Sequence, residues 1–449
     1  MSILLLLLSI VGLVLLIIKV KLHPFFALLL VSICFALLSG MSGDLIITSI
    51  QNGFGSTLGK IGLVIIMGVV IGAFLENTGA AMSLAEGVLS FVGKQNVIIA
   101  MGVVGYIISI PVFCDSGFLL MNSLNRNLTK KAGISLAATA IALALGLILT
   151  HNLVPPTPGP IAAAATLNAD LALVIPFGLI TAAVGLVAGL VFAKFYASKT
   201  YIDPDNNALV PVDNIILTNS KLAYRPGFFL SSLPILVPIL LIVGKSVLKA
   251  TNFINEESFV SSTINFMGES VIALLIGVFL CLLLPEKLHK DMISSDGWIG
   301  KCFKDAASIL LITGAGGIFG TVLKDSGVAD QLGEHLSTYN IGIFLPFILG
   351  AALKSSQGSS TVALITVASI ILPLMPVLGL VSETDKALAV TAIGSGALVV
   401  CHANDSFFWV VTQMSGMNVK QGYQLLSLGT LIVGCTSMVA TYILFVILH

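Results

Sequence analysis

Charged side chains are scarce in this chain. Asp, Glu, Lys and Arg make up 9% of its 449 residues, against about 25% in an ordinary soluble domain. Basic and acidic residues balance at 21 each, so no net positive charge favours binding to nucleic acid. The six cysteines lack the spacing of metal ligands, so we expect no metal site and no disulfide framework. The sequence contains no H-E-x-x-H, G-x-S-x-G or P-loop motif, which argues against an enzyme and against an ATP-driven pump.

Long apolar runs recur from end to end, and the mean hydropathy is +1.07. Several runs, such as Val174–Phe192 and Leu426–Leu448, reach the roughly 18–20 residues that cross a bilayer core. They do not alternate apolar and polar residues as the strands of a membrane barrel do. We therefore expect an all-α, polytopic membrane protein surrounded by lipid. The first run has no basic leading region and no small-residue cleavage site, so we expect it to be retained as a span.

Two parts of the chain share polar and glycine positions in the same order, at nearly constant spacing. Chance similarity between two apolar segments is the alternative, but ordered polar positions favour an internal repeat. We expect a first repeat over residues 1–200, a cytoplasmic linker over 201–226 and a second repeat over 227–449. The matched positions are Gly68 with Gly316, Gly72 with Gly320, Asp115 with Ser356, His151 with His402 and Asn168 with Asn418.

The positions of Lys and Arg predict the topology. Most of them fall in four segments that we expect to be loops, and all four lie in the cytoplasm only if the N-terminus is outside. These loops are Lys19–Lys21, Arg126–Lys131, Lys194–Arg225 and Lys287–Lys304. This arrangement requires re-entrant hairpins at about 97–125 and 341–371. The result is about ten transmembrane helices plus two hairpins, in two repeats of inverted topology, which is typical of secondary transporters. Both termini then lie on the outer side of the membrane.

Four polar interruptions occur at corresponding places in the two halves. Two are the predicted hairpin tips, and two are breaks in helices near 151–160 and 402–406. Irregular backbone at membrane depth is tolerated only where it is buried in protein or lines a wet cavity. The ends of broken helices attract ions, because their N–H and C=O groups lack helical partners. The substrate-binding candidates are Ser116, Gly117, Asn152, Thr157, Lys354, Ser355, Ser356, Gln357, Gly358, Ser359, Ser360, Thr361 and Asn404.

Lys354 is the sharpest of these candidates. A charge at the bilayer centre costs roughly 2.5–3.5 kcal/mol, so it needs a partner. That partner is either a substrate carboxylate or a structural one, namely Asp115 or Asp405; the side chain could also reach the membrane interface. Short hydroxyls and amides nearby suit a hydroxylated ligand, and patching of the broken backbone is their alternative role.

Four titratable residues are candidates for ion coupling: Asp115, His151, His402 and Asp405. Each carboxylate or imidazole could carry a proton. The alternatives are structural, since Asp is a common helix N-cap and a lone His in a helix break often serves as a hydrogen-bonding group. The sequence supports H⁺ as the coupling ion, leaves Na⁺ open, and suggests no other cofactor.

Several stretches together resemble the gluconate:proton symporter family of bacterial permeases. The similarity covers almost the full chain, and the resembling stretches are KVKLHPFFALLL (19–30), THNLVPPTPGPIAAA (150–164), KDSGVA (324–329), LKSSQGSSTVALIT (353–366) and IGSGALVVCHANDSFFW (393–409). The resemblance implies a symporter of the bacterial cytoplasmic membrane for gluconate or a related hydroxy acid, forming homodimers and moving in an elevator manner. Both termini, which we expect outside, are then periplasmic. Many sugar-acid members have Glu-Val-Gly where this chain has Asp115-Ser116-Gly117, and Arg where it has Lys354. Arg offers a bidentate fork of donors, whereas Lys offers a point charge. The substrate and the coupling ion therefore stay open.

The sequence thus favours import of a small hydroxylated monocarboxylate by proton symport. The main alternative is a sodium- or proton-coupled carrier for another small organic anion, such as glycerate or a hydroxy-amino acid. An intramembrane enzyme is a remote alternative.

Overall fold

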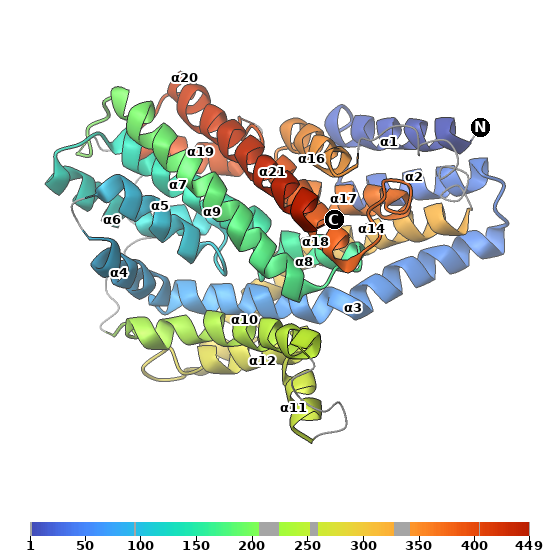
Figure 1. Ribbon diagram of the computed structural model, residues 1–449, viewed down its shortest axis with the longest axis horizontal. Coiled ribbons are helices and arrows are strands. Elements are labelled where there is room, and N and C mark those ends of the chain that lie inside the picture. Colours follow the sequence, from blue (N-terminus) through green and yellow to red (C-terminus); the bar gives the residue numbers. More distant parts are fainter. Residues whose placement is uncertain are drawn as a thin grey trace.

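The computed structural model describes residues 2–93, 96–205, 224–251, 259–326, 342–403 and 405–448. Across these ranges the regular elements are helices (Figure 1), so the prediction of an all-α chain is confirmed. The longer helices are α1 (Ser2–Ile18), α2 (Pro24–Leu38), α3 (Gly43–Asn77), α4 (Ala80–Val92), α5 (Val97–Ile108), α6 (Cys114–Ala132), α7 (Leu136–Leu153), α8 (Pro158–Thr166), α9 (Leu171–Phe195), α10 (Phe228–Thr251), α11 (Phe259–Met267), α12 (Ser270–Cys281), α14 (Trp298–Asp325), α16 (Phe344–Gln357), α17 (Ser360–Ile371), α18 (Glu383–Leu398), α19 (Ser406–Ser415) and α21 (Leu428–Leu448).

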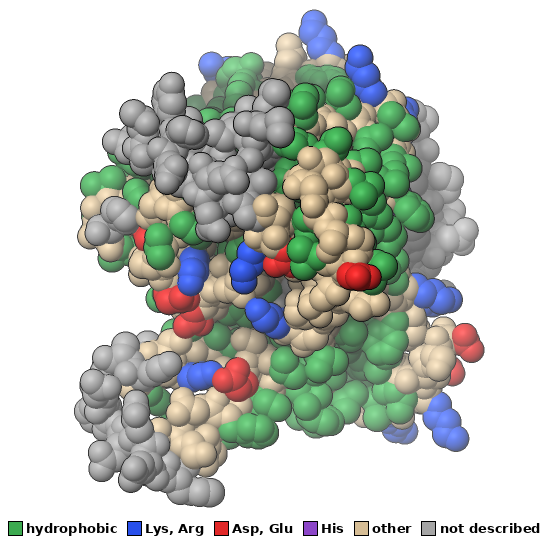
Figure 2. Space-filling model, turned by 90° about the vertical axis from the view of Figure 1, so that its right-hand side faces the viewer, with side chains coloured by type: hydrophobic (Ala, Val, Ile, Leu, Met, Phe, Trp, Pro, Cys, Tyr) green, Lys and Arg blue, Asp and Glu red, His purple; other side chains and the backbone are tan. Residues whose placement is uncertain are grey.

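The lengths and the surface of these helices suit a lipid bilayer. Within the described ranges, five helical segments are long and apolar enough to cross a membrane, or up to seven if each of two bent pairs forms one span. Large apolar side chains such as Phe91, Phe229 and Leu240 are exposed, and hydrophobic side chains cover much of the face in Figure 2. Broad apolar exposure of this kind fits contact with lipid. The total of about ten spans stays a prediction.

Helices α3 and α14 pack along each other, with α10, α11 and α12 drawn below α3 in Figure 1. Their backbones touch where glycines face each other. A Cβ on Gly53 would lie 2.6 Å from the carbonyl oxygen of Gly317, which is closer than any side chain allows. Small residues at such crossings permit the close helix packing that stabilises membrane bundles.

Two helical hairpins form at the predicted places. The first consists of α5 and α6, and the second of α16 and α17, with the turns at 109–113 and 358–359. One boundary differs: the loop expected at Arg126–Lys131 is instead the last part of α6. The helix continues because its buried face repeats at helical spacing, and it stops only at Gly133, whose left-handed φ of 65° ends it.

Two helices break where the sequence predicted. Helix α7 ends at Leu153, and α8 restarts at Pro158, with its proline in the first turn, where a missing N–H does no harm. In the second half, α18 ends at Leu398 and α19 starts at Ser406. All 18 residues of α7 are buried, so this break lies deep in the protein.

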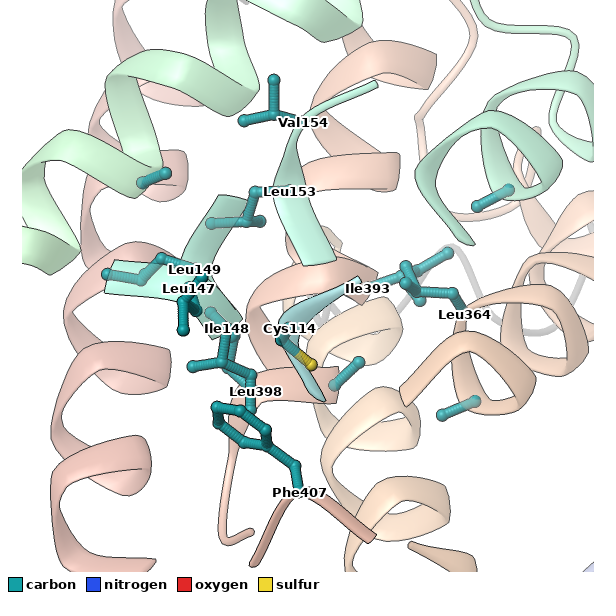
Figure 3. Close-up of a cluster of buried hydrophobic side chains, with 14 of the residues drawn as sticks. Cys114, Leu147, Ile148, Leu149, Leu153, Val154, Leu364, Ile393, Leu398 and Phe407 are labelled. Atoms are coloured by element: carbon teal, nitrogen blue, oxygen red, sulfur yellow. The ribbon is translucent and has the colours of Figure 1, made fainter. Parts of the chain in front are cut away.

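The hairpin of each half packs on the broken helix of the other half. Helix α6 of the first hairpin packs on α19, and α17 of the second hairpin packs on α8. Buried side chains from both halves meet around these contacts (Figure 3), among them Cys114, Ile148, Leu364, Leu398 and Phe407. The four polar interruptions are therefore brought to one place.

Glycines on α3 let the backbone of this region approach. A Cβ on Gly72 would lie 2.5 Å from the carbonyl oxygen of Pro111 in the first hairpin turn. A Cβ on Gly68 would lie 2.6 Å from the carbonyl oxygen of Pro156 in the α7–α8 break. Helix α3 therefore supports both irregular segments of the first half through direct backbone contact.

Candidate functional site

A cavity of about 460 Å³ lies where the hairpin tips and the helix breaks meet. Both halves contribute to its wall. The lining residues are Phe113, Cys114, Asp115, Ile148, His151, Ser308, Ile309, Ile312, Gly358, Ser359, Ser360, Thr361, Val362, Ile365, Asp405, Ser406 and Phe407. Nine residues of this list are apolar or glycine, and the polar remainder consists of five hydroxyls, two carboxylates and one imidazole. This mixture is typical of a site for a small polar ligand.

Three helices begin at the cavity wall. Helix α6 starts at Cys114, α17 starts at Ser360 and α19 starts at Ser406. The first N–H groups of a helix have no acceptor within the helix, and the helix dipole places partial positive charge there. Helix ends of this kind stabilise an anion, and at α19 this place is already taken by the carboxylate of Asp405, which accepts from the N–H of Phe407.

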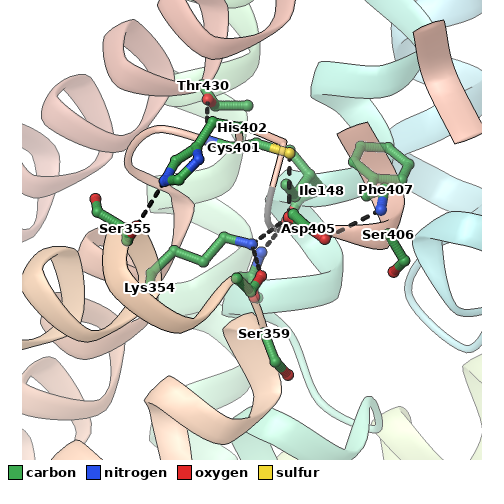
Figure 4. Close-up of polar contacts among 12 residues, drawn as sticks. Ile148, Lys354, Ser355, Ser359, Cys401, His402, Asp405, Ser406, Phe407 and Thr430 are labelled. Atoms are coloured by element: carbon green, nitrogen blue, oxygen red, sulfur yellow. Dashed lines mark hydrogen bonds and ion pairs between the residues drawn. The ribbon is translucent and has the colours of Figure 1, made fainter. Parts of the chain in front are cut away.

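Lys354 does not line the cavity. It sits in the last turn of α16, is 1% exposed, and forms a buried ion pair with Asp405 (Figure 4). Its ammonium group also donates to the carbonyl oxygen of Gly358. The structure therefore adopts the structural pairing that the sequence left open. A charge taken out of water needs such a partner, and Lys354 has two.

Asp405 is held on several sides. One carboxylate oxygen accepts from Lys354 and, at 3.0 Å, from the thiol of Cys401. The other accepts from the backbone N–H of Phe407 at 3.0 Å and so caps α19. This carboxylate therefore has a cationic partner and also caps a helix, and both contacts hold it in place in the cavity wall.

Asp115 is in a different situation. It lies in the first turn of α6 and accepts from the hydroxyl of Ser406, with oxygen–oxygen distances of 3.3 and 3.5 Å. No salt bridge to Asp115 occurs in the described part of the chain. Of the two carboxylates at the cavity, Asp115 is therefore the one without a cationic partner.

The two histidines separate. His151 of α7 lines the cavity, is 5% exposed, and its Nδ1 has no hydrogen-bond partner among the described residues. His402 is outside the lining and its Nε2 lies 2.6 Å from the carbonyl oxygen of Ser355. Because a carbonyl only accepts, Nε2 of His402 is a donor. It thereby ties the second break to the second hairpin.

Only part of the Ser/Thr cluster of the second hairpin lines the cavity. Gly358, Ser359, Ser360 and Thr361 line the cavity. Ser356 faces away, with its hydroxyl donating to the carbonyl oxygen of Leu353 at 2.9 Å. The side chain of Gln357 and the whole of Asn404 lie outside the described residues.

The remaining predicted residues support the backbone instead of lining the cavity. Asn152 donates to the carbonyl oxygen of Ile148 at 2.9 Å, and Thr157 donates to that of Val154 at 2.6 Å. Ser116 is half-buried in α6, and Gly117 has no room for a Cβ, which would lie 2.7 Å from a methyl of Leu147.

Sequence reasoning missed Ser308, Ser406 and Cys114 as lining residues. Ser308 is one of three hydroxyl residues in the long helix α14, and nothing in the sequence distinguishes it from Thr313 or Thr321. Ser406 could have been found from the sequence, because it directly follows Asp405. If Asp405 is an N-cap, Ser406 is the first residue of the next helix.

Comparison with known proteins agrees with this architecture. The GntP family permease profile matches residues 1–447. The gluconate permease of Pseudomonas aeruginosa is 30% identical over 93% of this chain and 92% of its own length. The D-serine transporter DsdX of Escherichia coli K12 is 32% identical over 98% of this chain and 97% of its own length.

A solved structure shares the fold. The YdaH transporter of Alcanivorax borkumensis superposes with a TM-score of 0.63 over 95% of this chain and 98% of that chain, at 14% identity. The sequence matches come from permeases and transporters and not from enzymes, so an intramembrane enzyme is set aside. With its apolar helices and full-length match, this multi-pass membrane protein belongs to the GntP family of permeases.

Proposed function

We propose that this permease is a secondary active transporter that imports a small hydroxylated monocarboxylate, gluconate or a related sugar acid, together with a proton. The observation that carries the proposal is the cavity itself. Three helix N-termini, several hydroxyls and Asp115, a carboxylate with no cationic partner among the described residues, converge there from both halves of the chain. An anion with hydroxyl groups is the ligand that this combination suits.

The carboxylate of the substrate would bind at the start of α17. The N–H groups of Ser360 and Thr361 occupy the first helical positions, whose donors lack helical acceptors. The side chain of Ser359 already caps Val362 at 3.3 Å, which leaves the earlier N–H groups for a ligand. Hydroxyls of Ser360, Thr361, Ser308 and Ser406 would then meet the hydroxyl groups of the substrate.

Lys354 would act on the substrate through Asp405. Its charge balances the carboxylate that caps α19, so the cavity wall carries no uncompensated anion there. A direct Lys354–carboxylate contact would require the ammonium to leave Asp405. We therefore assign Lys354 a positioning role, in which it joins the second hairpin to the second break.

Asp115 is the proposed proton carrier. An anionic substrate entering beside an ionised Asp115 would meet repulsion, because like charges in a poorly hydrated cavity disfavour each other. Protonation of Asp115 removes that repulsion, so substrate and proton favour each other's binding. His151, whose Nδ1 lacks a partner in the described chain, is the second candidate.

The alternative proposal is a sodium- or proton-coupled carrier of another small organic anion, such as glycerate or a hydroxy-amino acid. The relative named as a D-serine transporter favours it, since it covers nearly the whole chain. A hydroxy-amino acid carries an amine beside its hydroxyl. It would suit a cavity lined by two carboxylates at least as well as a sugar acid would.

The proposal includes a setting and a mode of movement. We place the protein in the bacterial cytoplasmic membrane with both termini periplasmic, as a homodimer. Its halves form inverted repeats and move in an elevator manner. The matched exchange of contacts, α6 on α19 and α17 on α8, supports the repeat relationship.

Proteoliposomes provide the test. Purified protein is reconstituted, and uptake of labelled gluconate, glycerate and D-serine is measured under an imposed pH gradient, a sodium gradient, or neither. Proton symport predicts concentrative uptake of one of these substrates under the pH gradient alone. Uptake that follows only sodium would support the alternative coupling ion, and uptake of none would reject this substrate class.

A further inference from the structure

One face of α6 carries a stripe of mostly polar side chains, of which Asp115 is part-exposed and the other members are buried. Its residues repeat at spacings of three and four, so they form a single stripe along the helix: Asp115, Phe118, Asn122, Asn125 and Thr129. A buried stripe on an amphipathic helix is normally apolar. Here Phe118 is the only apolar member, and the stripe extends about 21 Å by helix geometry.

The polar atoms of this stripe are poorly satisfied. Oδ1 of Asn122, Nδ2 of Asn125 and Oγ of Ser415 are buried and have no hydrogen-bond partner in the described part of the chain. Ser415 ends α19, the helix that packs on α6. Buried polar atoms are ordinarily paired, and ordered water is the usual partner where protein supplies none.

The far end of the stripe reaches an aqueous face. Thr129 shares a 2.7 Å hydrogen bond with Thr139 of α7. The next residue, Lys130, forms a 2.8 Å ion pair with Asp205, and both side chains are 61% exposed. Arg126 donates to the carbonyl oxygens of Pro204 and Met414 there.

The near end is closed by an aromatic pair. Phe118 of α6 and Phe407 of α19 contact edge to face, with ring centroids 6.3 Å apart. Both are buried, and Phe407 lines the cavity. The pair therefore stands between Asp115 at the cavity and Asn122 in the stripe.

We propose that this interface is a hydrated proton path from Asp115 to the face that carries residues 198–205, with the Phe118–Phe407 pair as its gate. The inference rests on the proposed proton coupling. Asp115 would pass its proton to a water molecule, and each water that gains a proton on one side releases one on the other. The amides of Asn122 and Asn125 orient these waters without titrating. The charged and titratable groups around Asp115 are Cys114, His151, Asp405 and the paired Lys354.

Cysteine labelling tests the hydration without any transport assay. Three variants on α6 are compared: Asn125→Cys in the stripe, Met121→Cys at a buried apolar position, and Ser123→Cys at an exposed position. A small water-soluble thiol reagent is applied to folded protein, and labelling at each position is followed by peptide mass spectrometry, with the wild type as baseline. A hydrated path predicts that Asn125→Cys reacts about tenfold faster than Met121→Cys, because thiol reactivity follows access to water. Equal, slow labelling at these two positions overturns the path.

Proton leak tests the gate. Phe118→Ala in proteoliposomes without substrate should conduct protons about tenfold faster than the wild type, because a full side chain is removed from the block. Phe118→Leu, which refills the space, and Phe35→Ala, which removes a buried ring from α2, should not. A leak in Phe118→Ala no faster than in these controls, with thermal unfolding showing folded protein, overturns the gate. Fast labelling of Asn125→Cys together with sodium-driven uptake would instead reject the coupling ion and keep the water path.

Discussion

The ammonium of Lys354 pairs with the carboxylate of Asp405 inside the protein, joining α16 of the second hairpin to the first residue before α19. The two residues are far apart in sequence, and each belongs to a different polar interruption. The pair thus ties a hairpin tip to a helix break at the edge of the cavity. It neutralises Asp405 and leaves Asp115 as the cavity carboxylate without a cation among the described residues.

Breaking this pair on one side should destabilise the protein more than removing both charges. Lys354→Met leaves Asp405 buried and unpaired, which costs about 3–5 kcal/mol. Lys354→Met combined with Asp405→Asn should recover most of that loss, because Asn keeps an acceptor for the cap of α19. Thermal unfolding in detergent gives the comparison. A double variant as unstable as the single one would contradict a specific pairing.

Asp115→Asn should uncouple transport from the proton. The amide keeps an oxygen acceptor for Ser406 but cannot titrate, so concentrative uptake under a pH gradient is lost while exchange of substrate across the membrane continues. Counterflow with labelled substrate measures the exchange, and Asp115→Glu is the matched control that retains a titratable group. Normal pH-driven accumulation by Asp115→Asn would assign the proton to another residue.

Loss of a cavity hydroxyl should weaken substrate binding. Ser360→Ala removes a hydroxyl that lines the cavity, and one lost hydrogen bond to a ligand is worth about 1.4 kcal/mol, or tenfold in affinity. Ser356→Ala is the control, since its hydroxyl bonds to Leu353 and faces away from the cavity. Isothermal titration or a thermal shift against substrate compares them. Equal weakening in both variants would mean that the effect is structural.

How far the sequence predicts this site can be seen at individual residues. The tips were visible because polar residues interrupt apolar runs, where irregular backbone requires a protein or water environment. The choice between Asp115 and Asp405 as the partner of Lys354 was not visible, since it depends on the distances in space between three separate segments, of which the one that holds Asp405 is 51 residues from Lys354. Ser308 was hidden for another reason: one hydroxyl in an apolar helix usually bonds to its own backbone.

The boundary of the first hairpin shows a second limit. The lysines and the arginine at 126–131 predicted a loop, but they lie in the last part of the continuing helix α6, where both lysines are exposed. Charge alone does not end a helix, whereas the glycine at 133 does.

Crowding of the first hairpin tip should destabilise the site. Gly72→Ala places a Cβ about 2.5 Å from the carbonyl oxygen of Pro111, so the turn must shift, at about 1–3 kcal/mol. Gly55→Ala, also on α3, meets no atom within 4 Å and should be neutral or more stable by up to about 1 kcal/mol. Thermal unfolding and uptake are measured for both. Full transport and stability in Gly72→Ala would contradict the close support of the tip by α3.

A structure of the reconstituted protein with its bound carboxylate tests the central claim most directly. The ligand is whichever of gluconate, glycerate or D-serine most raises the melting temperature of the purified protein. The account predicts ligand density in the cavity between the N-terminus of α17 and Asp115, with its carboxylate on the N–H groups of Ser360 and Thr361 and its hydroxyls near Ser406. Density at a site that none of these residues touches, with this cavity unchanged, would contradict it.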